Sequence, residues 1–374
     1  MKRLPSLNGL RAISIIIVIL FHLARFNFGI SAKTLFHFPF LDGQFGVNVF
    51  FVISGFLITS LLMYEEEQTG VISIKHFYAR RILRIFPAYF FLLLVYWGLQ
   101  LIGYIHIDPM AWLTALTYTK YLNYRADYYT AHAWSLSIEE TFYLFWPIIF
   151  IARKKLRKGL VIFLILFVPI LRVYLYFYPI HWIDEQSIFT RIDSIAMGCF
   201  FALYKEKILL SLNSHWSKLF YFSITALFLL PWIADLVSKT PLNLIFISLG
   251  VLHGSIANVL IAFIMMYSVF GPNGTWYKML NSKAFNYVGT LSYSLYLWQQ
   301  LFLFKKSWWE TQLWWETQLP QNLLFIVLTA IFSHYIIEEP FLRLKSRFSS
   351  RKKEEYPSNP NKAQHLVLDE KGIR

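Results

Sequence analysis

The chain has 374 residues, of which 57% are hydrophobic, 19% aromatic and only 15% charged, with a mean hydropathy of +0.48. Soluble domains carry about 25% charged residues, so this chain has too little charge to cover a water-facing surface. Its apolar residues come in runs of roughly 20, long enough to cross a hydrocarbon core, and not in the alternating segments of about ten that are typical of a membrane β-barrel. The composition therefore excludes a soluble enzyme, a nucleic-acid-binding domain and a disordered chain. It predicts an all-α, polytopic membrane protein.

Ten apolar stretches are the predicted membrane helices. They cover residues 10–26, 45–63, 85–103, 134–152, 160–178, 187–204, 217–237, 245–270, 287–304 and 322–340. Residues 1–344 are therefore expected to form one transmembrane domain. The polar and basic segment 345–374 is expected to be a disordered cytoplasmic tail.

The basic residues indicate the orientation of these helices. An even number of spans places both termini on the same side, and the segments on that side hold most of the lysine and arginine, including the run RKKLRK at 153–158. By the positive-inside rule both termini are cytoplasmic. Basic loops beside anionic lipid then account for the net charge of +14 without any role for nucleic acid.

Cysteine and histidine usage argues against disulfide and metal chemistry. The single cysteine, Cys199, cannot form an intramolecular disulfide. The histidines in apolar runs have no metal-ligand spacing with cysteine or carboxylate partners, so no metal site is expected.

Two ionisable residues share the first predicted helix. Arg11 and His22 are eleven positions apart, which is about 20° past three full turns, so both project from one face about 16 Å apart along the axis. Arg11 is expected near the inner boundary and His22 toward the outer third. Charged groups inside a membrane cost roughly 2.5–3.5 kcal/mol each and are functional candidates for that reason. Snorkelling by Arg11 and ordinary packing of His22 are the structural alternatives.

Two further predicted helices begin with ionisable residues. Glu139 and Glu140 open the fourth span, and Arg191 and Asp193 open the sixth. Counted from the span boundaries, Glu139 and Arg191 lie about 6–8 Å below the outer surface, at the depth of His22. An imidazole, a carboxylate and a guanidinium in one layer can supply a general base, its orienting partner and an electrostatic stabiliser. An unrelated ion pair between Glu139 and Arg191 is the alternative.

Arginines gather at the expected inner boundary. Arg11 lies there with Arg80, Arg81 and Arg84, and the spacing puts Arg80 and Arg84 on one helix face. Guanidinium groups bind phosphate oxygens well, so these arginines are candidates for a phosphate-bearing ligand. Binding of lipid headgroups is the alternative without a catalytic role. Together the two layers suggest a ligand that is anionic at its cytoplasmic end and reactive about 16 Å further out. Acyl-coenzyme A has that shape.

Seven segments carry a family resemblance. They are LNGLRAISIIIVILFHL at 7–23, GVNVFFVISGFLIT at 46–59, RRILRIFPAY at 80–89, WSLSIEETFYLFWP at 134–147, RIDSIAMG at 191–198, GTLSYSLYLWQ at 289–299 and IIEEPF at 336–341. In this order they resemble the membrane acyltransferase-3 family, which contains bacterial O-acetyltransferases of surface polysaccharides. The resemblance extends over nearly the whole predicted membrane domain.

The resemblance implies transfer of an acyl group, usually acetyl, from cytoplasmic acyl-coenzyme A to a hydroxyl of an extracytoplasmic glycan, by a protein of the bacterial inner membrane. It makes His22, Glu139 and Arg191 the expected catalytic residues. His22 would deprotonate the acceptor or carry the acyl group itself, Glu139 would fix the imidazole tautomer, and Arg191 or backbone amides near Ser135 would stabilise the oxyanion. The expected donor-binding residues are Arg11, Arg80, Arg81 and Arg84.

The sequence departs from the family pattern at one position. Many members have histidine where this chain has Gln299, and glutamine cannot exchange a proton near neutral pH. The departure strengthens the assignment of His22. Some members also carry a fused extracytoplasmic domain, and none is expected here, so the membrane domain would complete the transfer or hand over to a separate glycan-handling protein.

A secondary transporter or flippase is the rival interpretation. Many spans with charges inside the membrane fit a translocation path. However, no inverted repeat is visible, and the inner arginine cluster has no obvious use in such a protein. Consumption of acyl-coenzyme A would separate the two interpretations.

Overall fold

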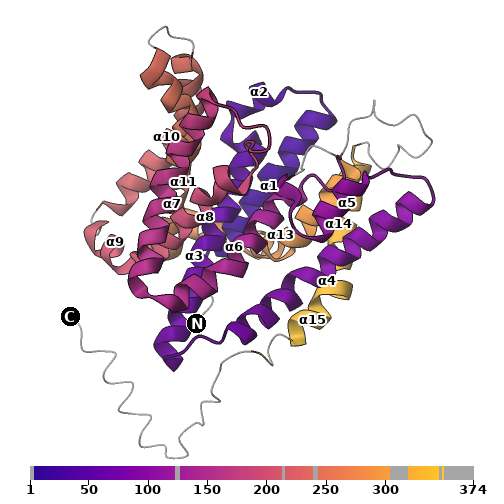
Figure 1. Cartoon of the computed structure of the whole chain (residues 1–374), viewed down its shortest axis with the longest axis horizontal. Helices are drawn as coiled ribbons and strands as arrows, with labels where there is room; N and C mark the ends of the chain where they lie inside the picture. Colours follow the sequence, from indigo (N-terminus) through magenta and orange to yellow (C-terminus); the bar gives the residue numbers. More distant parts are fainter. Residues whose placement is uncertain are drawn as a thin grey trace, which may run out of the picture.

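The computed structural model describes residues 4–122, 127–212, 215–238, 243–303, 319–344 and 348. Helices and connecting loops make up the described residues, with no strand among them, and this confirms the all-α prediction (Figure 1). The predicted tail 345–374, apart from Phe348, lies outside the described residues. The helices are α1 (Leu7–Phe26), α2 (Ala32–Phe36), α3 (Gly43–Thr69), α4 (Ile74–Leu101), α5 (Pro109–Leu116), α6 (Ala133–Ala152), α7 (Lys154–Phe177), α8 (Ile188–Leu203), α9 (Lys205–Leu212), α10 (Trp216–Ser238), α11 (Asn243–Phe270), α12 (Thr275–Leu280), α13 (Lys283–Phe302), α14 (Gln321–Phe332) and α15 (Glu339–Leu344), with short helical turns η1 (Pro39–Leu41), η2 (Lys120–Leu122) and η6 (Ser333–Glu338).

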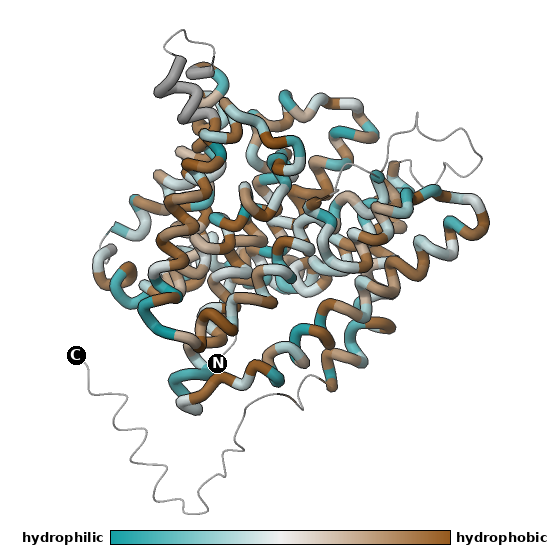
Figure 2. Tube along the Cα trace, in the orientation of Figure 1, coloured by the Kyte–Doolittle hydropathy of each residue, from teal (hydrophilic) through white to brown (hydrophobic). Residues whose placement is uncertain are grey.

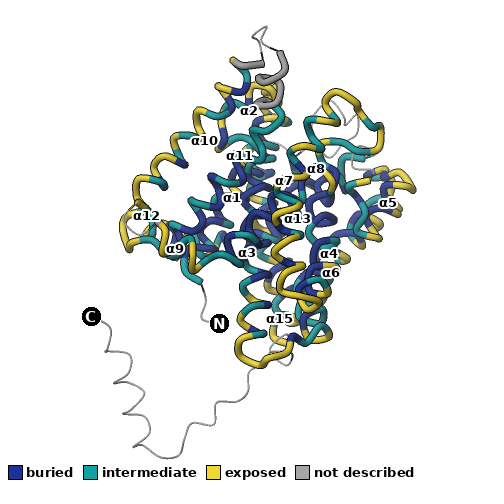
Figure 3. Tube along the Cα trace, turned by 60° about the vertical axis from the view of Figure 1, so that its left-hand side comes forward, coloured by how far each residue is buried: buried dark blue, intermediate teal, exposed yellow. Residues whose placement is uncertain are grey.

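Eight helical segments of the described chain are long and apolar enough to cross a membrane: α1, α3, α4, α6, α7, α10, α11 and the continuous segment Gln321–Leu344. This confirms a polytopic membrane protein. The other two predicted spans are also helices, but α8 has only 16 residues, and α13 carries buried polar side chains such as Ser292 and Gln299. Most of α8 and the second half of α13, from Leu291 to Gln300, are buried against neighbouring helices (Figure 3).

Hydrophobic residues dominate the long helices, and hydrophilic residues gather mainly at helix ends and connections (Figure 2). Many of the large apolar side chains on α4 and α7 are exposed, among them Leu94, Trp97, Phe163, Leu166 and Ile170. In a membrane protein such faces contact lipid, because lipid tails are as apolar as the side chains themselves.

Glycines allow the central helices to approach closely. A Cβ on Gly55 of α3 would stand 2.0 Å from the carbonyl oxygen of Ile195 in α8, and a Cβ on Gly198 of α8 would stand 2.0 Å from that of Val52. Small residues at such crossings are the usual means of packing membrane helices. α3 therefore packs against α8 on one side and against α1, through Gly46, on the other. Two cavities lie on different faces of α3.

Candidate active site

A cavity of about 180 Å³ opens between α1, α3, α4, α6 and α13. We call it the arginine cavity. Three of its lining side chains are the guanidinium groups of Arg11, Arg81 and Arg84, and a fourth is the carboxylate of Glu139. The sequence predicted these residues as candidates, and the fold brings them together from three helices.

The Arg81 guanidinium is fully engaged within the protein. Its Nη2 lies 2.9 Å from Glu140 Oε1 and 3.6 Å from Glu139 Oε2, and the group stands 3.6 Å above the ring of Tyr143. Glu139 in turn accepts a hydrogen bond of 3.1 Å from Ser54 Oγ. Because buried guanidinium groups need such partners, Arg81 and its carboxylates form the fixed wall of the cavity.

Arg11 and Arg84 differ from Arg81 in having no such partners. Within the described part of the chain, neither guanidinium forms an ion pair or a hydrogen bond. The two groups repel each other, and Glu139 is a carboxylate that acts on both. Positive charge therefore exceeds negative charge at this end of the cavity. An anionic ligand would relieve that excess.

The arginine cavity does not include Arg80. Its Nη2 lies 2.8 Å from Glu65 Oε2 of α3, and its Nη1 donates to the carbonyl of Phe348 at 2.9 Å. The i, i+4 spacing predicted that Arg80 and Arg84 share a face, but the face that meets the cavity is that of Arg81 and Arg84. The carboxylate of Glu65 holds Arg80 outside it.

His22 is not among the residues that line the arginine cavity. Its Nδ1 is 3.2 Å from Oε1 of Gln299, which is fully buried. An amide oxygen only accepts hydrogen bonds, so Nδ1 carries the proton and Nε2 keeps its lone pair. Tyr296, one turn earlier on α13, lines the cavity and bonds to Ser135 Oγ at 2.7 Å. Tyr296 and Ser135 thus stand between the cavity and the imidazole.

The expected layer of His22, Glu139 and Arg191 is not assembled. Glu139 lies about 6 Å further along α6 than Ser135 and pairs with Arg81 rather than with His22. The ionisable neighbour of His22 is His132, which precedes α6 and interacts with it electrostatically. His132 is seven positions before Glu139, two turns along one helix face. That spacing is the sequence signal that could have identified it.

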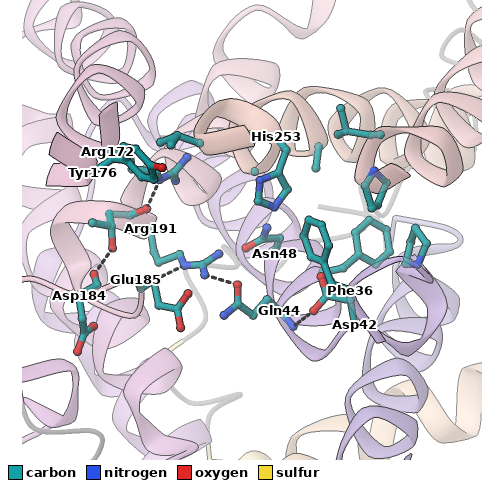
Figure 4. A pocket seen from close by; sticks show the side chains of 18 of the residues that line it. Phe36, Asp42, Gln44, Asn48, Arg172, Tyr176, Asp184, Glu185, Arg191 and His253 are labelled. Atoms are coloured by element: carbon teal, nitrogen blue, oxygen red, sulfur yellow. Dashed lines mark hydrogen bonds between the residues drawn. The ribbon is translucent and has the colours of Figure 1, made fainter. Parts of the chain in front are cut away.

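Arg191 lies in a different cavity, of about 380 Å³, on another face of α3. It donates to Gln44 Oε1 and to the carbonyl of Glu185, with Asn48 and His253 nearby (Figure 4). We call this cavity the second pocket. Since Glu139 pairs with Arg81, the alternative of a Glu139–Arg191 ion pair is not realised either. Among the described residues no three histidine, cysteine or acidic side chains gather closely enough to hold a metal ion.

The geometry defines a multi-pass membrane protein with a cationic cavity near a half-buried imidazole. A family model described as "Acyltransferase domain" matches residues 4–338. The protein named "Putative O-acetyltransferase SACOL0978" of Staphylococcus aureus (strain COL) is 29% identical over 376 residues, covering 91% of this chain and 58% of that protein. "O-acetyltransferase OatA" of Staphylococcus aureus (strain NCTC 8325 / PS 47) is 30% identical over 327 residues, covering 79% of this chain and 50% of that protein.

The chain therefore belongs to the acyltransferase-3 family. It spans about half the length of the curated relatives it matches. No solved structure matches it.

Proposed function

We propose that this chain is a membrane O-acetyltransferase that moves an acyl group, most simply acetyl, from cytoplasmic acyl-coenzyme A to a hydroxyl of an extracytoplasmic surface glycan. The observation that carries the proposal is the pair of guanidinium groups, Arg11 and Arg84, that have no partner among the described residues and line one cavity. Tyr296 lines the same cavity one turn before Gln299, the partner of His22. Membership of the family supports acyl transfer. The names of the relatives support an O-acetyl product.

The size of the arginine cavity fits one part of such a donor. Its volume of about 180 Å³ is below the roughly 300 Å³ at which sites for drug-sized ligands begin. It suits the slim arm that ends in the thioester rather than the nucleotide. The phosphates would stay at the entrance, against Arg11 and Arg84, because guanidinium forks bind phosphate oxygens in pairs.

The orientation belongs to the same proposal. Both termini and the segment 345–374 would be cytoplasmic, since the basic loops indicate that side of a bacterial inner membrane. Residues 1–344 would form the catalytic membrane domain. The donor would then enter beside Arg84 from the cytosol, and the acceptor would reach His22 from outside.

His22 would act as the general base. Its Nε2 takes the proton of the acceptor hydroxyl while that oxygen attacks the thioester carbonyl. A C–O bond forms and the C–S bond breaks. The departing thiolate takes the proton back from the imidazolium, so atoms and charge balance. Gln299, which accepts from Nδ1, would set the tautomer in place of Glu139.

The other two expected catalytic residues receive different roles. Glu139 would offset the positive charge of the arginine cavity, because it contacts Arg81 and acts on Arg11. Arg191 would serve the second pocket, where its partners Gln44 and Glu185 lie. Oxyanion stabilisation would fall to a donor beside His22, because Glu139 and Arg191 both bond elsewhere.

The first test replaces the base. His22→Ala, expressed in cells that lack the wild-type gene, should lower acetyl ester on surface glycans by at least about 100-fold, the usual contribution of a general base. Mass spectrometry of the extracted glycans measures it. His76→Ala, an exposed histidine at the start of α4, is the matched control and should acetylate normally. Near-normal acetylation by His22→Ala would exclude the mechanism, and solute uptake without consumption of acyl-coenzyme A would favour a transporter.

A further inference from the structure

The second pocket is separate from the arginine cavity and shares no lining residue with it. On α3, Gln44 and Asn48 face the second pocket, whereas Val47 and Phe51 face the arginine cavity. The second pocket thus meets α3 only near its start, whereas the arginine cavity is lined by α3 from Val47 to Leu61. A ligand in the second pocket cannot be the group that reacts in the other.

Asn48 carries an unused acceptor into the second pocket. Asn48 is only 5% exposed, and no described residue donates a hydrogen bond to its Oδ1. In Figure 4 the side chain lies between Gln44 and His253, facing the open space. A buried oxygen without a donor is unfavourable, and a ligand with an N–H or O–H donor would satisfy it. Water is the smallest such ligand, but the volume of about 380 Å³ holds much more.

Carboxylates outnumber guanidinium groups in the second pocket, since Asp42, Asp184 and Glu185 line it beside Arg172 and Arg191. Arg172 pairs with Asp193 and donates to the carbonyl of Thr190, and Arg191 donates to Gln44 and to a backbone carbonyl. Phosphate or another strong anion would meet the carboxylates with no guanidinium free to receive it. The lining therefore disfavours an anion and favours a ligand that donates hydrogen bonds.

Polar groups and aromatic rings together indicate the class of that ligand. Phe36 and Tyr176 border the polar lining (Figure 4), and aromatic side chains supply apolar contact area with a fixed geometry. A sugar ring has both a C–H face for such contact and hydroxyl groups that donate to carboxylate and amide oxygens. The pocket volume is at the lower end of the range for ligand sites, which suits one sugar unit or a little more.

We propose that the second pocket binds a sugar unit of the acceptor glycan that is not itself acylated, with Asn48 Oδ1 accepting from one of its hydroxyl groups. The pocket would hold the glycan while another unit reaches His22 across α1, whose Phe21 touches Gly43 at the start of α3. That the bound sugar belongs to the acceptor glycan rests on the proposed function. Sugar binding itself needs no donor.

Saturation-transfer difference NMR on the purified full chain in lipid nanodiscs tests the proposal, with the β-1,4-linked tetramer of N-acetylglucosamine as a neutral probe. The wild type should transfer saturation to the protons of the probe, and Asn48→Leu should reduce the transfer at least fivefold. Asn48→Asp, which keeps the acceptor atom, should restore most of it. Asn286→Leu is the matched control, because Asn286 only bonds the backbone of its own helix, and it should bind as the wild type does.

Several results would overturn the proposal. They are equal transfer in Asn48→Leu and wild type, absence of transfer in the wild type, or displacement of the probe by phosphatidylglycerol, which would identify a lipid site. If Asn48→Leu does not fold, Tyr176→Ala replaces it, since that side chain is 57% exposed and should weaken transfer severalfold without unfolding the chain. His22→Ala should bind the probe normally. If the wild type binds the sugar but does not acetylate glycans in cells, only the proposed function is contradicted. If it acetylates glycans but does not bind the sugar, only sugar binding in the second pocket is contradicted.

Discussion

The two cavities beside α3 contain similar residue types in opposite states of charge. In the arginine cavity, Arg11 and Arg84 have no partner among the described residues. In the second pocket, Arg172 and Arg191 are fully engaged, and the unused group is an amide oxygen on Asn48. The arginine cavity therefore lacks an anion, and the second pocket lacks a hydrogen-bond donor to the Asn48 oxygen.

The difference shows that counting arginines does not identify an anion site. A guanidinium that already binds protein acceptors has its donors in use, whereas one without partners retains the full cost of its burial. The state of the partners therefore separates the donor side of the proposed reaction from the acceptor side. Substitutions that remove one charged group or one hydrogen-bond partner at a time test this distinction.

The largest effect is expected at Arg84. Arg84→Ala removes a charged donor from the arginine cavity and should raise the KM for acetyl-coenzyme A about 10- to 100-fold, because a hydrogen bond to a charged group contributes about 1.5–3 kcal/mol. Arg80→Ala on the same helix is the matched control. Arg80 binds Glu65 outside the cavity, so its KM should change less than about threefold. Steady-state kinetics on the purified chain measure both, and equal effects would show that the state of pairing is irrelevant.

A smaller effect is expected at Gln299. Gln299→Leu removes the acceptor from His22 Nδ1 and should lower kcat about 3- to 10-fold, the worth of one neutral hydrogen bond, with the KM for acetyl-coenzyme A unchanged. Gln299→Glu keeps an acceptor oxygen at this position and should restore kcat. A rise in KM without a fall in kcat would place Gln299 on the donor side and contradict its role at the imidazole.

The sequence predicted the fold well because lipid imposes a strong pattern. Runs of about 20 apolar residues can only be helices in a membrane, and each of the ten predicted stretches is helical in the structure. Only α8 and α13, among the ten predicted spans, are not long and apolar enough to count as membrane spans by length and composition. These helices are shielded by neighbours, so α8 is short and α13 tolerates Ser292 and Gln299.

The candidate site was harder to predict because depth along a helix does not give the direction of a side chain. Arg11, Arg81 and Arg84 were expected near one another and do line one cavity. Glu139 and Arg191 were predicted at one depth, but they line different cavities that share no residue. Helix rotation and packing decide that outcome, and a single sequence carries little information on either.

The smallest expected effect is a pH dependence of stability that arises in the second pocket. Burial raises the pKa of Asp42, which precedes α3, from 3.8 to about 6, although Arg191 and the Gln44 amide partly oppose the shift and Glu185 adds to it. Between pH 4 and 6 the folded chain then keeps a proton that the unfolded chain releases. The free energy of unfolding should therefore fall as pH rises through this window and level off above about 6. Thermal unfolding in nanodiscs from pH 4 to 7 measures the trend, and Asp42→Asn, which keeps an oxygen acceptor for the Gln44 amide, should flatten it. Glu185→Gln measures how much the neighbouring carboxylate contributes to the trend. If the dependence of stability on pH is unchanged in Asp42→Asn, the titrating group is another one.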